Sequence, residues 1–457
     1  MAEQERERWG TRTGFILAAV GSAIGLGNMW RFPYLTAEYG GASFVFFYII
    51  LIFLIGIPVM IAELILGRGS GRSPVQALAQ KGEKNWGWLG YLFVLTGFGI
   101  LSYYSVVAGW TIRYMLDSLS GTLMATDSEQ YFISVREGMD ALVYHLAFMA
   151  ITTGIVFGGV RKGIERSVKL LIPLLGVLVI GLAIWAFFQP GSLAGYEFYL
   201  APNWSSLVSI YTVGDISFYF LNLNLLAAAG GQVFFTLSLG MGAIITYASY
   251  IREDKDLIGE SAIISFSNFS ISFLAGLMIF PIIFSSNLVT EIQESTLGTL
   301  FITIPEAFQR IGGWWGNLLS FVFFACLMLA ALTSAISLLE VVTSTLIDEL
   351  NITRRKAASG SGFAIFLGGI PAALSLGWLG LADEIAGHFL LMLGGFFLAV
   401  YIGWVMKGAL EELNRGLNIE LTSVWYFLVR YIVPPALLAL LISISWSLPV
   451  DIWNFFF

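Results

Sequence analysis

The sequence predicts an all-α polytopic membrane protein with eleven membrane-spanning helices, and three observations support this. Hydrophobic residues make up 57% of the 457 residues and charged residues only 12%, with a mean hydropathy of +0.82. Soluble domains are about half apolar and about a quarter charged. Apolar segments of roughly 20 residues, the length that crosses a bilayer, recur along the chain. Lysine and arginine gather in alternate loops between them.

We expect a single membrane domain over residues 1–457. The predicted spans cover residues 13–37, 41–66, 88–120, 141–159, 166–189, 223–251, 257–286, 315–349, 359–379, 383–407 and 424–450. A polar loop, 121–140, is expected outside, and a long, partly amphipathic stretch, 190–222, precedes the sixth span. Residues 297–313 are too short and too polar to span, so we expect an external helix there, lying over an entrance.

Positively charged side chains predict the orientation. They precede the first span and follow each even-numbered span, at Arg6, Arg8, Arg12, Arg68, Arg72, Lys81, Lys84, Arg161, Lys162, Arg166, Lys169, Arg252, Lys255, Arg354, Arg355, Lys356, Lys407 and Arg415. The opposite loops carry few, with Arg136 and Arg310 as the main exceptions. Because cytoplasmic loops are enriched in these residues, we expect a multi-pass protein of the inner (plasma) membrane with a cytoplasmic N-terminus and an external C-terminus. The first apolar segment shows no cleavage site and is interpreted as a retained helix.

The composition argues against several classes of function. Cys326 is the only cysteine, which excludes an internal disulfide framework and a cysteine-rich metal site. His145 and His388 are the only histidines, so neither a multi-histidine metal centre nor a histidine proton relay is expected. The sequence has no H-E-x-x-H motif and no evident nucleophile–base pair. We therefore expect neither enzymatic activity nor a nucleic-acid partner.

The most informative segment lies in the first span, at Gly21–Pro33 (GSAIGLGNMWRFP). Backbone groups freed from a helix in hydrocarbon cost several kcal/mol each unless protein, water or a ligand satisfies them. Gly21 and Gly25 also have the G-x-x-x-G spacing of a helix-packing face. Packing alone does not call for Asn28 and Arg31 at that depth, so we favour a helix broken around a bound ion and a bound substrate.

A second glycine-bearing break, Gly231–Gly242 (GQVFFTLSLGMG), lies in the sixth span. It comes five spans after the first, and an odd offset reverses the orientation of the second unit in the membrane. Paired breaks in matching spans are typical of inverted-repeat transporters with a site at the midplane. We therefore predict one repeat over 13–189, a second over 223–407, and an additional span over 424–450.

The start of the fifth span has two interpretations. Nine residues separate Gly163 from Pro173 there, and both residue types weaken a helix. The segment is either a plain helix start or a helix end that unwinds to open an inner water path.

Four segments carry a resemblance to a known family. They are Trp9–Tyr34 (WGTRTGFILAAVGSAIGLGNMWRFPY), Gly40–Arg68 (with GGASF and GIPVMIAELILGR), Gly231–Tyr250 (GQVFFTLSLGMGAIITYASY) and Leu332–Ser337 (LTSAIS). Over nearly its whole length the chain resembles the neurotransmitter:sodium symporters, in particular prokaryotic hydrophobic amino-acid members such as the bacterial leucine transporter and an eleven-span multi-hydrophobic amino-acid transporter. The resemblance implies a leucine-transporter-like fold with discontinuous first and sixth helices.

The resemblance also implies two sodium sites. The implied ligands of the first are the carbonyl of Ala23, the side-chain oxygens of Asn28 and Asn268, and both oxygens of Thr236, with the substrate carboxylate completing the shell. The implied ligands of the second are the carbonyls of Gly21, Ile24 and Ala330 and the hydroxyls of Thr333 and Ser334. Taken singly, each of these side chains also suits a purely structural role, because Thr and Ser in spans often bond back to the preceding turn and Asn can bridge helices.

A substrate site is implied between the two breaks. Broken helix ends offer N–H groups to an anion, so the N–H groups of Leu26 and Gly27 and the Tyr104 hydroxyl are expected to bind a carboxylate. The ammonium group is expected to bind the carbonyls of Ala23, Phe235 and Thr236 and the Ser238 hydroxyl. The side-chain pocket is expected to be lined by Ile100, Tyr104, Phe235, Met241 and Leu338, with Ser22 and Ser334 at its margin.

Gly25 is expected to decide the substrate class. Monoamine members of the family have an aspartate at this position, so here the substrate is expected to supply its own carboxylate. No charged residue lines the expected pocket, and methionine at position 241 adapts to irregular shapes. A branched-chain, methionine or aromatic amino acid is therefore expected, although core packing explains each apolar residue taken alone.

The resemblance further implies two gates and an anion site. An arginine inside a span needs a partner, and the implied external pair is Arg31 with Asp383. The implied internal pair is Arg6 with Asp348, capped by Trp9 and reached by Tyr250; a solvated helix end is the alternative for Asp348. The residues that surround chloride in chloride-dependent members correspond here to Tyr48, Gln232, Thr236, Asn268 and Ser272. Glu63 or another acid is the alternative to chloride.

Together these inferences predict sodium-coupled symport of hydrophobic or aromatic L-amino acids into the cell by alternating access. The expected ions are Na⁺ at two sites, with Cl⁻ left open. The expected partners are a small-molecule amino acid and the lipid bilayer, with the protein a monomer or a weak homodimer. The alternatives are transport of another small zwitterion such as a glycine- or betaine-like solute, a non-transporting amino-acid sensor, and an ion channel.

Overall fold

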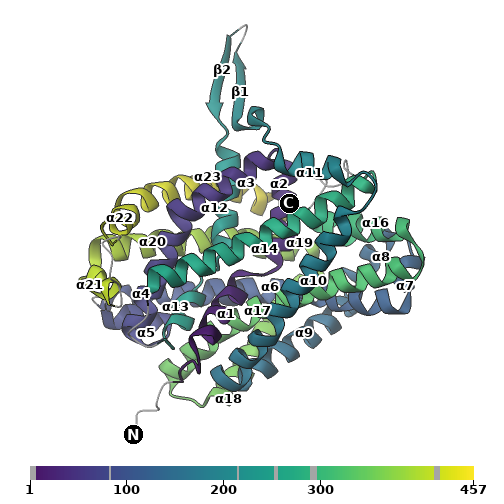
Figure 1. Ribbon diagram of the computed structural model, residues 1–457. Coiled ribbons are helices and arrows are strands. Elements are labelled where there is room, and N and C mark those ends of the chain that lie inside the picture. Colours follow the sequence, from purple (N-terminus) through teal and green to yellow (C-terminus); the bar gives the residue numbers. More distant parts are fainter. Residues whose placement is uncertain are drawn as a thin grey trace.

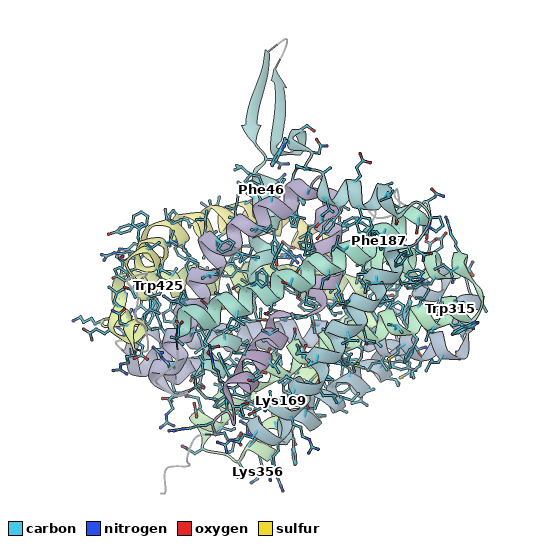
Figure 2. The ribbon with its side chains drawn as sticks, viewed as in Figure 1. Phe46, Lys169, Phe187, Trp315, Lys356 and Trp425 are labelled. Carbon is cyan, nitrogen blue, oxygen red and sulfur yellow. The ribbon has the colours of Figure 1, made fainter. Side chains whose placement is uncertain are left out.

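The computed structural model describes residues 7–81, 84–213, 216–251, 256–288, 296–415 and 422–456. The chain forms a bundle of helices from which one β-hairpin projects, at the end opposite the N-terminus (Figure 1). We call the end with the hairpin the hairpin side and the opposite end the N-terminal side. Lys169 and Lys356 lie at the N-terminal side and Phe46 lies near the hairpin (Figure 2). The orientation in the membrane stays a prediction.

Within the described ranges, nine helices are long and apolar enough to cross a membrane, or ten if the bent first pair is one span. They are Arg12–Glu38 with its break, Ala42–Ser70, Gly87–Ser120, Met139–Phe157, Val160–Phe187, Leu257–Ser285, Gly313–Leu350, Arg354–Leu374, Leu376–Val405 and Thr422–Ile444. Each overlaps a predicted span. The predicted sixth span is divided into α12 (Leu223–Thr236) and α13 (Ala243–Ala248), which are too short to cross singly. The count of eleven therefore stays a prediction.

Several spans contain more than one helical segment. The uninterrupted ones are α6 (Gly87–Ser120), α9 (Met139–Phe157), α14 (Leu257–Ser285), α17 (Gly313–Leu350) and α18 (Arg354–Leu374). The composite ones are built from α1 (Arg12–Ala23), η1 (Gly27–Arg31) and α2 (Phe32–Glu38); α3 (Ala42–Leu51), η2 (Ile52–Gly56) and α4 (Ile57–Ser70); η4 (Val160–Glu165) and α10 (Arg166–Phe187); α19 (Leu376–Ala382), η8 (Asp383–Leu390), α20 (Leu391–Val400) and η9 (Tyr401–Val405); and α22 (Thr422–Phe427), η10 (Leu428–Ile432) and α23 (Val433–Phe456). Short helices connect them: α5 (Pro74–Lys81), η3 (Lys84–Trp86), α7 (Thr122–Ala125), α8 (Ser128–Val135), α11 (Ser192–Leu200), η5 (Trp204–Leu207), α15 (Thr296–Gly298), η7 (Thr299–Thr303), α16 (Ile304–Ile311) and α21 (Ala409–Asn414).

The bundle is all-α as predicted, and one connecting stretch outside it forms strands instead. Strands β1 (Val208–Val213) and β2 (Ile216–Leu221) pair antiparallel within the long stretch before α12, with Val208 opposite Leu221 and Val213 opposite Ile216. Both strands are rich in the β-branched and aromatic residues that favour extended backbone. The hairpin projects from the bundle (Figure 1), so this stretch does not have to pack as a helix among the other helices.

Both predicted breaks are present. Helix α1 ends at Ala23, Ile24 has extended backbone, and the chain resumes as η1 with a 46° bend between the two halves. In the second break, Ser238, Gly240 and Gly242 have positive φ, a conformation that glycine adopts without strain. A Cβ on Gly240 would lie 2.1 Å from the Leu391 carbonyl oxygen. Glycine is therefore required there for backbone conformation and for close packing.

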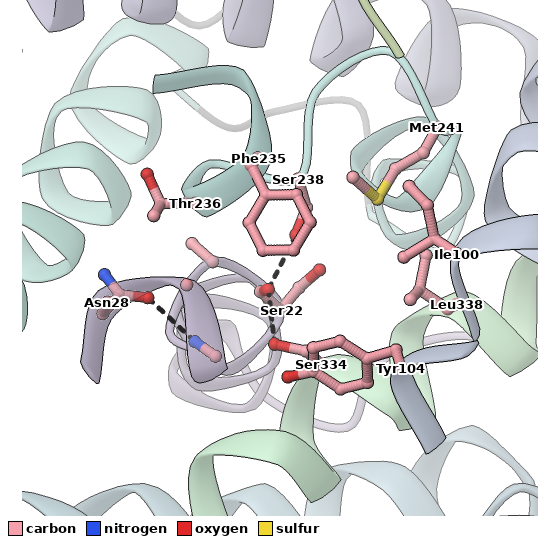
Figure 3. A pocket seen from close by; sticks show the side chains of 13 residues that line it. Ser22, Asn28, Ile100, Tyr104, Phe235, Thr236, Ser238, Met241, Ser334 and Leu338 are labelled. Carbon is pink, nitrogen blue, oxygen red and sulfur yellow. Dashed lines mark hydrogen bonds between the residues drawn. The ribbon is translucent and has the colours of Figure 1, made fainter. Parts of the chain in front are cut away.

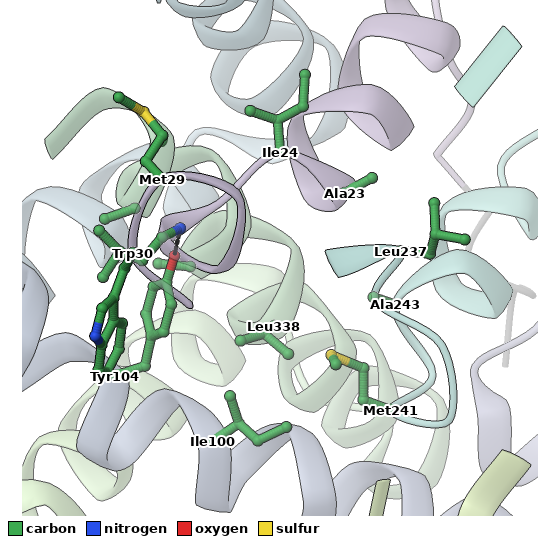
Figure 4. Packing of buried hydrophobic residues seen from close by; sticks show 14 of the residues in the cluster. Ala23, Ile24, Met29, Trp30, Ile100, Tyr104, Leu237, Met241, Ala243 and Leu338 are labelled. Atoms are coloured by element: carbon green, nitrogen blue, oxygen red, sulfur yellow. Dashed lines mark hydrogen bonds between the residues drawn. The ribbon is translucent and has the colours of Figure 1, made fainter. Parts of the chain in front are cut away.

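Helix α1 lies inside the bundle, against α10, α14 and α17, and α17 packs along α6. Buried apolar side chains from these elements meet around the two breaks, where Ile100, Met241 and Leu338 lie together (Figure 4). Large apolar side chains on the outer faces of α9 and α10, such as Val143 and Leu170, are exposed, as a lipid environment allows.

The start of the fifth span is helical throughout. Gly163 lies in η4, a π-helical segment, and Pro173 lies inside α10. The structure therefore shows this segment wound, with a locally widened turn, and both interpretations of the spacing stay predictions.

Candidate functional site at the two broken helices

A small pocket lies between the two breaks (Figure 3). Its lining comes from the first break with its flanks in α1 and η1, from α6, from the end of α12 and the break that follows it, and from α17. The lining residues are Ser22, Ala23, Gly25, Gly27, Asn28, Ile100, Tyr104, Phe235, Thr236, Ser238, Met241, Ser334 and Leu338. The cavity has a volume of about 20 Å³, which is room for about one water molecule.

The structure brings the predicted substrate residues together. Every residue expected to bind substrate lines the pocket except Leu26, whose backbone N–H donates to the Tyr104 hydroxyl at 3.0 Å. Ser238 and Ser334 both donate to the Ser22 carbonyl, at 2.7 and 3.0 Å. These bonds join α6, α17 and the sixth span to the backbone around the first break, where the helix is interrupted.

At two glycines the backbone itself lines the pocket, because neither position has room for a side chain. A Cβ on Gly25 would lie 2.5 Å from Ser334 Oγ and 3.0 Å from the Tyr104 hydroxyl oxygen. A Cβ on Gly27 would lie 2.6 Å from Cδ1 of Phe235. Any side chain at either position would compete for space with the groups that face the pocket.

A first cluster of oxygens lies beside the pocket. Asn28 Nδ2 donates to Asn268 Oδ1 at 2.6 Å, and Asn28 Oδ1 accepts from the Gly25 N–H at 2.9 Å. Asn268 Nδ2 lies 3.4 Å from Thr236 Oγ1. All three side chains are buried. Asn28 and Thr236, two of the four residues expected at the first sodium site, are therefore joined through a third, Asn268.

A second cluster joins α1 to α17. Thr333 Oγ1 lies 3.2 Å from the Ile24 carbonyl oxygen and 3.0 Å from that of Ala330. Ser334 Oγ lies 3.3 Å from the Ile24 carbonyl oxygen and 3.5 Å from that of Gly21. All five residues expected at the second sodium site are thus brought together, across up to 313 residues of sequence.

The oxygens in both clusters come from uncharged groups. Across the part of the chain that the structure describes, no group of three or more His, Cys, Asp or Glu side chains is arranged to hold a metal ion. Hard cations take oxygen ligands, including backbone carbonyls. The donor set fits a monovalent cation better than a transition metal, which would draw on imidazole or thiolate.

The residues expected around chloride are also close together. The Tyr48 hydroxyl lies 2.9 Å from Thr236 Oγ1 and 3.2 Å from Asn268 Nδ2. Ser272 Oγ accepts from Asn28 Nδ2 at 2.8 Å. Gln232 donates instead to the Gly27 carbonyl at 2.8 Å. The alternative acid, Glu63, accepts from the Gly240 N–H at 2.7 Å, at the second break.

The predicted external pair is not formed in this structure. Asp383 accepts from the Tyr103 hydroxyl at 2.7 Å. Arg31 contacts His388 Nε2 and lies over the Phe235 ring, 5.4 Å from its centroid. Asp383 and His388 are one turn apart on the π-helical η8, so both face this region, and the histidine is the one that reaches Arg31.

The predicted internal pair is only partly described. Arg6 lies outside the described residues, and Asp348 Oδ2 accepts from the Ser73 N–H at 2.7 Å. Trp9 lies at the N-terminal side as expected, and its Nε1 donates to the Tyr247 carbonyl at 2.9 Å. Tyr250 donates to Glu340 Oε1 at 2.6 Å.

The sequence does not predict one buried ion pair near this side. Arg354 makes a bidentate contact with Glu340, at 2.7 and 2.8 Å. The Glu340 side chain is fully buried, and Glu7 bonds the same arginine at 3.0 Å. In the sequence, Arg354 is only one of several loop charges and Glu340 lies within an apolar span. A carboxylate inside an otherwise apolar span is itself a signal for a buried partner.

Three comparisons with known proteins agree with this arrangement. The sequence profile of the Sodium:neurotransmitter symporter family matches residues 6–142 and 132–456. An uncharacterized sodium-dependent transporter of Haemophilus influenzae is 33% identical over 468 residues, which cover 96% of this chain and 98% of the relative. The sodium-dependent transporter YhdH of Bacillus subtilis is 32% identical, covering 97% of this chain and 99% of its own.

A solved structure extends the likeness to the fold. The crystal structure of MhsT in complex with L-phenylalanine has a TM-score of 0.85 and 38% identity, and the alignment covers 96% of this chain and all of that one. The alignment therefore spans the residues of both breaks and of the pocket between them. It supports the leucine-transporter-like arrangement, and sodium dependence follows from the relatives in full-length alignment. The chain belongs to the sodium:neurotransmitter symporter family, a family of sodium-coupled membrane transporters.

Proposed function

We propose that this sodium-dependent symporter carries hydrophobic or aromatic L-amino acids by alternating access. The observation that carries the proposal is the pocket between the two broken helices, whose described lining is apolar side chains, small hydroxyls, amides and backbone, without a charged side chain. An amino acid brings both of its charges with it, whereas an amine would find no counter-ion there. MhsT, at 38% identity, was solved with L-phenylalanine.

The polar end of the substrate would bind to the first break. The Leu26 N–H and the Tyr104 hydroxyl, now 3.0 Å apart, would both turn to the carboxylate, together with the Gly27 N–H at the start of η1. A helix N-terminus favours an anion through its free N–H groups and its dipole. The ammonium group would bind carbonyls of Ala23, Phe235 and Thr236, with the Ser238 hydroxyl beside them.

The apolar end would lie among Ile100, Phe235, Met241 and Leu338. A cavity of about 20 Å³ is smaller than any amino-acid side chain of this class, so binding requires these groups to separate. The ring of Phe235 is half-buried, and methionine has three rotatable bonds. We expect these two side chains to move most and to decide which substrate is preferred.

Coupling to sodium would follow from the two oxygen clusters. The substrate carboxylate would complete the shell of a cation at Ala23, Asn28, Thr236 and Asn268, so each would raise the affinity for the other. A cation among Gly21, Ile24, Ala330, Thr333 and Ser334 would tie α1 to α17. At about 100 mV, each positive charge that crosses inward releases roughly 2.3 kcal/mol, which drives accumulation.

Uptake into proteoliposomes tests the proposed substrate class. With an imposed sodium gradient, we expect saturable uptake of labelled phenylalanine, leucine or methionine, and none without the gradient. Glycine and betaine should compete poorly. Preferred uptake of glycine or betaine would support the small-zwitterion alternative. Sodium-dependent binding without any accumulation would support a sensor, and a non-saturable current a channel.

The sodium assignment has a matched pair of threonines on α17. Thr333→Ala removes a hydroxyl of the second cluster, whereas Thr343→Ala removes an equally buried hydroxyl that contacts Ser361 on α18 at 3.0 Å. We expect the first to raise the sodium concentration for half-maximal uptake about tenfold, the factor that 1.4 kcal/mol makes, and the second to leave it unchanged. Asn28→Ala should raise the sodium concentration for half-maximal uptake by about the same factor as Thr333→Ala. Equal effects of the two threonine variants would contradict the assignment.

The chloride question is tested separately. The family resemblance implies a carboxylate in chloride-independent members at the position where this chain has Ser272, whose hydroxyl contacts the Asn28 and Tyr48 side chains. We propose chloride dependence on this ground. Replacing chloride with gluconate should then reduce uptake by the wild type and leave Ser272→Glu unaffected. Wild-type uptake that is the same in gluconate would overturn it.

A further inference from the structure

Two buried glutamates hold the residues that lead into α1. Glu165 comes from η4, at the start of the fifth span, and Glu260 comes from α14, at the start of the seventh. Both side chains are at most 5% exposed. They approach the segment Gly10–Arg12 from two separate spans.

Glu165 binds this segment through both of its oxygens. Oε2 accepts from the Gly10 N–H at 2.7 Å, and Oε1 accepts from Thr11 Oγ1 at 2.8 Å and from Lys169 Nζ at 2.6 Å. Thr11 in turn caps α1, accepting from the Gly14 N–H at 3.0 Å. A Cβ on Gly14 would lie 2.3–2.6 Å from the Glu165 side chain. The sequence Gly10-Thr11-Arg12-Thr13-Gly14 therefore leaves room for this carboxylate.

Glu260 binds the next residue. Its Oε1 accepts from Arg12 Nε at 2.7 Å, and the glutamate side chain is 1% exposed while the arginine is 53% exposed. Its second oxygen, Oε2, is buried without a hydrogen-bond partner. Glu260 also lines a cavity of about 160 Å³ with Trp9, Thr11, Phe15 and Tyr250. The carboxylate is thus sheltered by the N-terminal half of the first span.

The first break separates α1 from the rest of its span, so the contacts of Glu165 and Glu260 act on α1 alone. Because the helix ends at Ala23, residues 12–23 are not continuous with the rest of the span and can move as a separate piece. Charge-assisted hydrogen bonds are stronger and shorter than neutral ones. A carboxylate left unpaired in a buried place is costly, so the contacts of Glu165 and Glu260 with the start of α1 favour its closed position.

We propose that Glu165 and Glu260 form a carboxylate clamp that sets how often the N-terminal half of the first span leaves its closed position. The clamp adds a step to the proposed alternating access and in that respect rests on it. Opening toward the N-terminal side exchanges the contacts with Gly10, Thr11 and Arg12 for water. The two glutamates act through the position of α1 and are positioning residues.

Hydrogen–deuterium exchange of the full-length protein, measured by mass spectrometry in sodium, tests the clamp. In Glu165→Gln the new NH₂ group faces a former donor, so we expect the amides of residues 13–23 to exchange about tenfold faster, the loss of one charge-assisted hydrogen bond. Glu260→Gln should give a smaller acceleration, and the double variant the largest. Glu412→Gln is the matched control, since it alters an equally buried pair with Arg68, at 3.1 Å, away from α1.

A second pair of variants keeps the test decisive if a glutamate variant fails to fold. Gly14→Ala displaces Glu165 without changing a charge, whereas Gly154→Ala on α9 meets nothing within 4 Å. Alanine favours a helix by about 1 kcal/mol over glycine, so faster exchange of residues 13–23 in Gly14→Ala would be opposite to the helix-propensity effect. Unchanged exchange in Gly14→Ala and in the double glutamate variant, or equal acceleration in Glu412→Gln, would overturn the clamp. The readout needs no transport, so it is independent of whether the substrate proposal holds.

Discussion

The two ends of the pocket are closed by different kinds of contact. On the N-terminal side, carboxylates hold α1 or the helices around it: Glu7, Glu165, Glu260 and Glu340. On the hairpin side, the polar contacts nearest the pocket are the Tyr103 hydroxyl with Asp383 and Arg31 with His388. Within the described residues, Arg31 and Asp383 do not pair directly. The N-terminal side therefore has several contacts made by carboxylates, whereas the hairpin side has two polar contacts near the pocket.

This difference predicts an asymmetry in how the protein opens. A buried charge that loses its partner costs several kcal/mol, whereas a bond at a partly exposed site costs far less. The N-terminal side should therefore open only when several contacts break together, and the hairpin side should open more readily. Sodium between α1 and α17 would add to the closure of the N-terminal side.

The largest expected effect is that of Arg354→Met. It leaves Glu340 buried without its bidentate partner, so we expect a loss of about 3–5 kcal/mol in the free energy of unfolding, measured by chemical denaturation of the purified protein in sodium. Arg310→Met, which breaks the half-exposed pair with Glu306 at 2.7 Å on the hairpin side, should cost at most about 1 kcal/mol. Similar losses in the two variants would remove the basis of the comparison.

A smaller effect is expected for Arg31→Gln on the hairpin side. The variant loses the contact with His388 and the position over the Phe235 ring, a cation–π contact that is worth about 0.5–1 kcal/mol at an exposed site and about 2 kcal/mol when desolvated. Substrate affinity in a binding assay should fall about tenfold because the bound state closes less well. Arg113→Gln is the control, because its partners Asp117 and Asp140 lie away from the pocket lining. A change of the same size in the control would assign the loss to the bundle as a whole.

The smallest effect is expected for Tyr103→Phe. This variant removes one hydroxyl, which donates to Asp383 at 2.7 Å, and an ordinary hydrogen bond contributes about 1 kcal/mol. Substrate affinity should therefore fall about fivefold. Tyr114→Phe removes an equally buried hydroxyl on the same helix, bonded to the Phe301 carbonyl at 2.9 Å, and should leave affinity unchanged. A loss in Tyr103→Phe larger than that in Arg31→Gln would mean that Asp383 is the main closing group.

Most of the pocket could be predicted from the sequence. Glycine at 25, 27, 240 and 242 weakens a helix wherever it occurs, and polar residues such as Asn28 do not belong in hydrocarbon without a partner. Both breaks are therefore predictable from local composition. Predicting the two oxygen clusters also requires the family resemblance, because Thr333 and Ile24 are 309 residues apart and no local pattern joins them.

The errors lie where a charge has more than one possible partner. The resemblance pairs Arg31 with Asp383, and the structure places His388 against it, because a helical turn brings both residues to the same region. The hairpin at 208–221 escapes prediction because its apolar residues suit a strand as well as a buried helix. Nothing local distinguishes Glu165 and Glu260, because each lies at the start of an otherwise ordinary span.

The sequence by itself determined that this chain has membrane-spanning segments and that its first and sixth spans break, and the family resemblance added the expectation of an uncharged pocket between the breaks. These properties depend on the solvent and on backbone conformation, which short stretches of sequence decide. Only the tertiary structure decided which charges meet: Arg354 with Glu340, Arg12 with Glu260, and Glu165 with the backbone of Gly10. Each of these contacts joins residues from different segments of the chain, so its geometry exists only after the helices have packed.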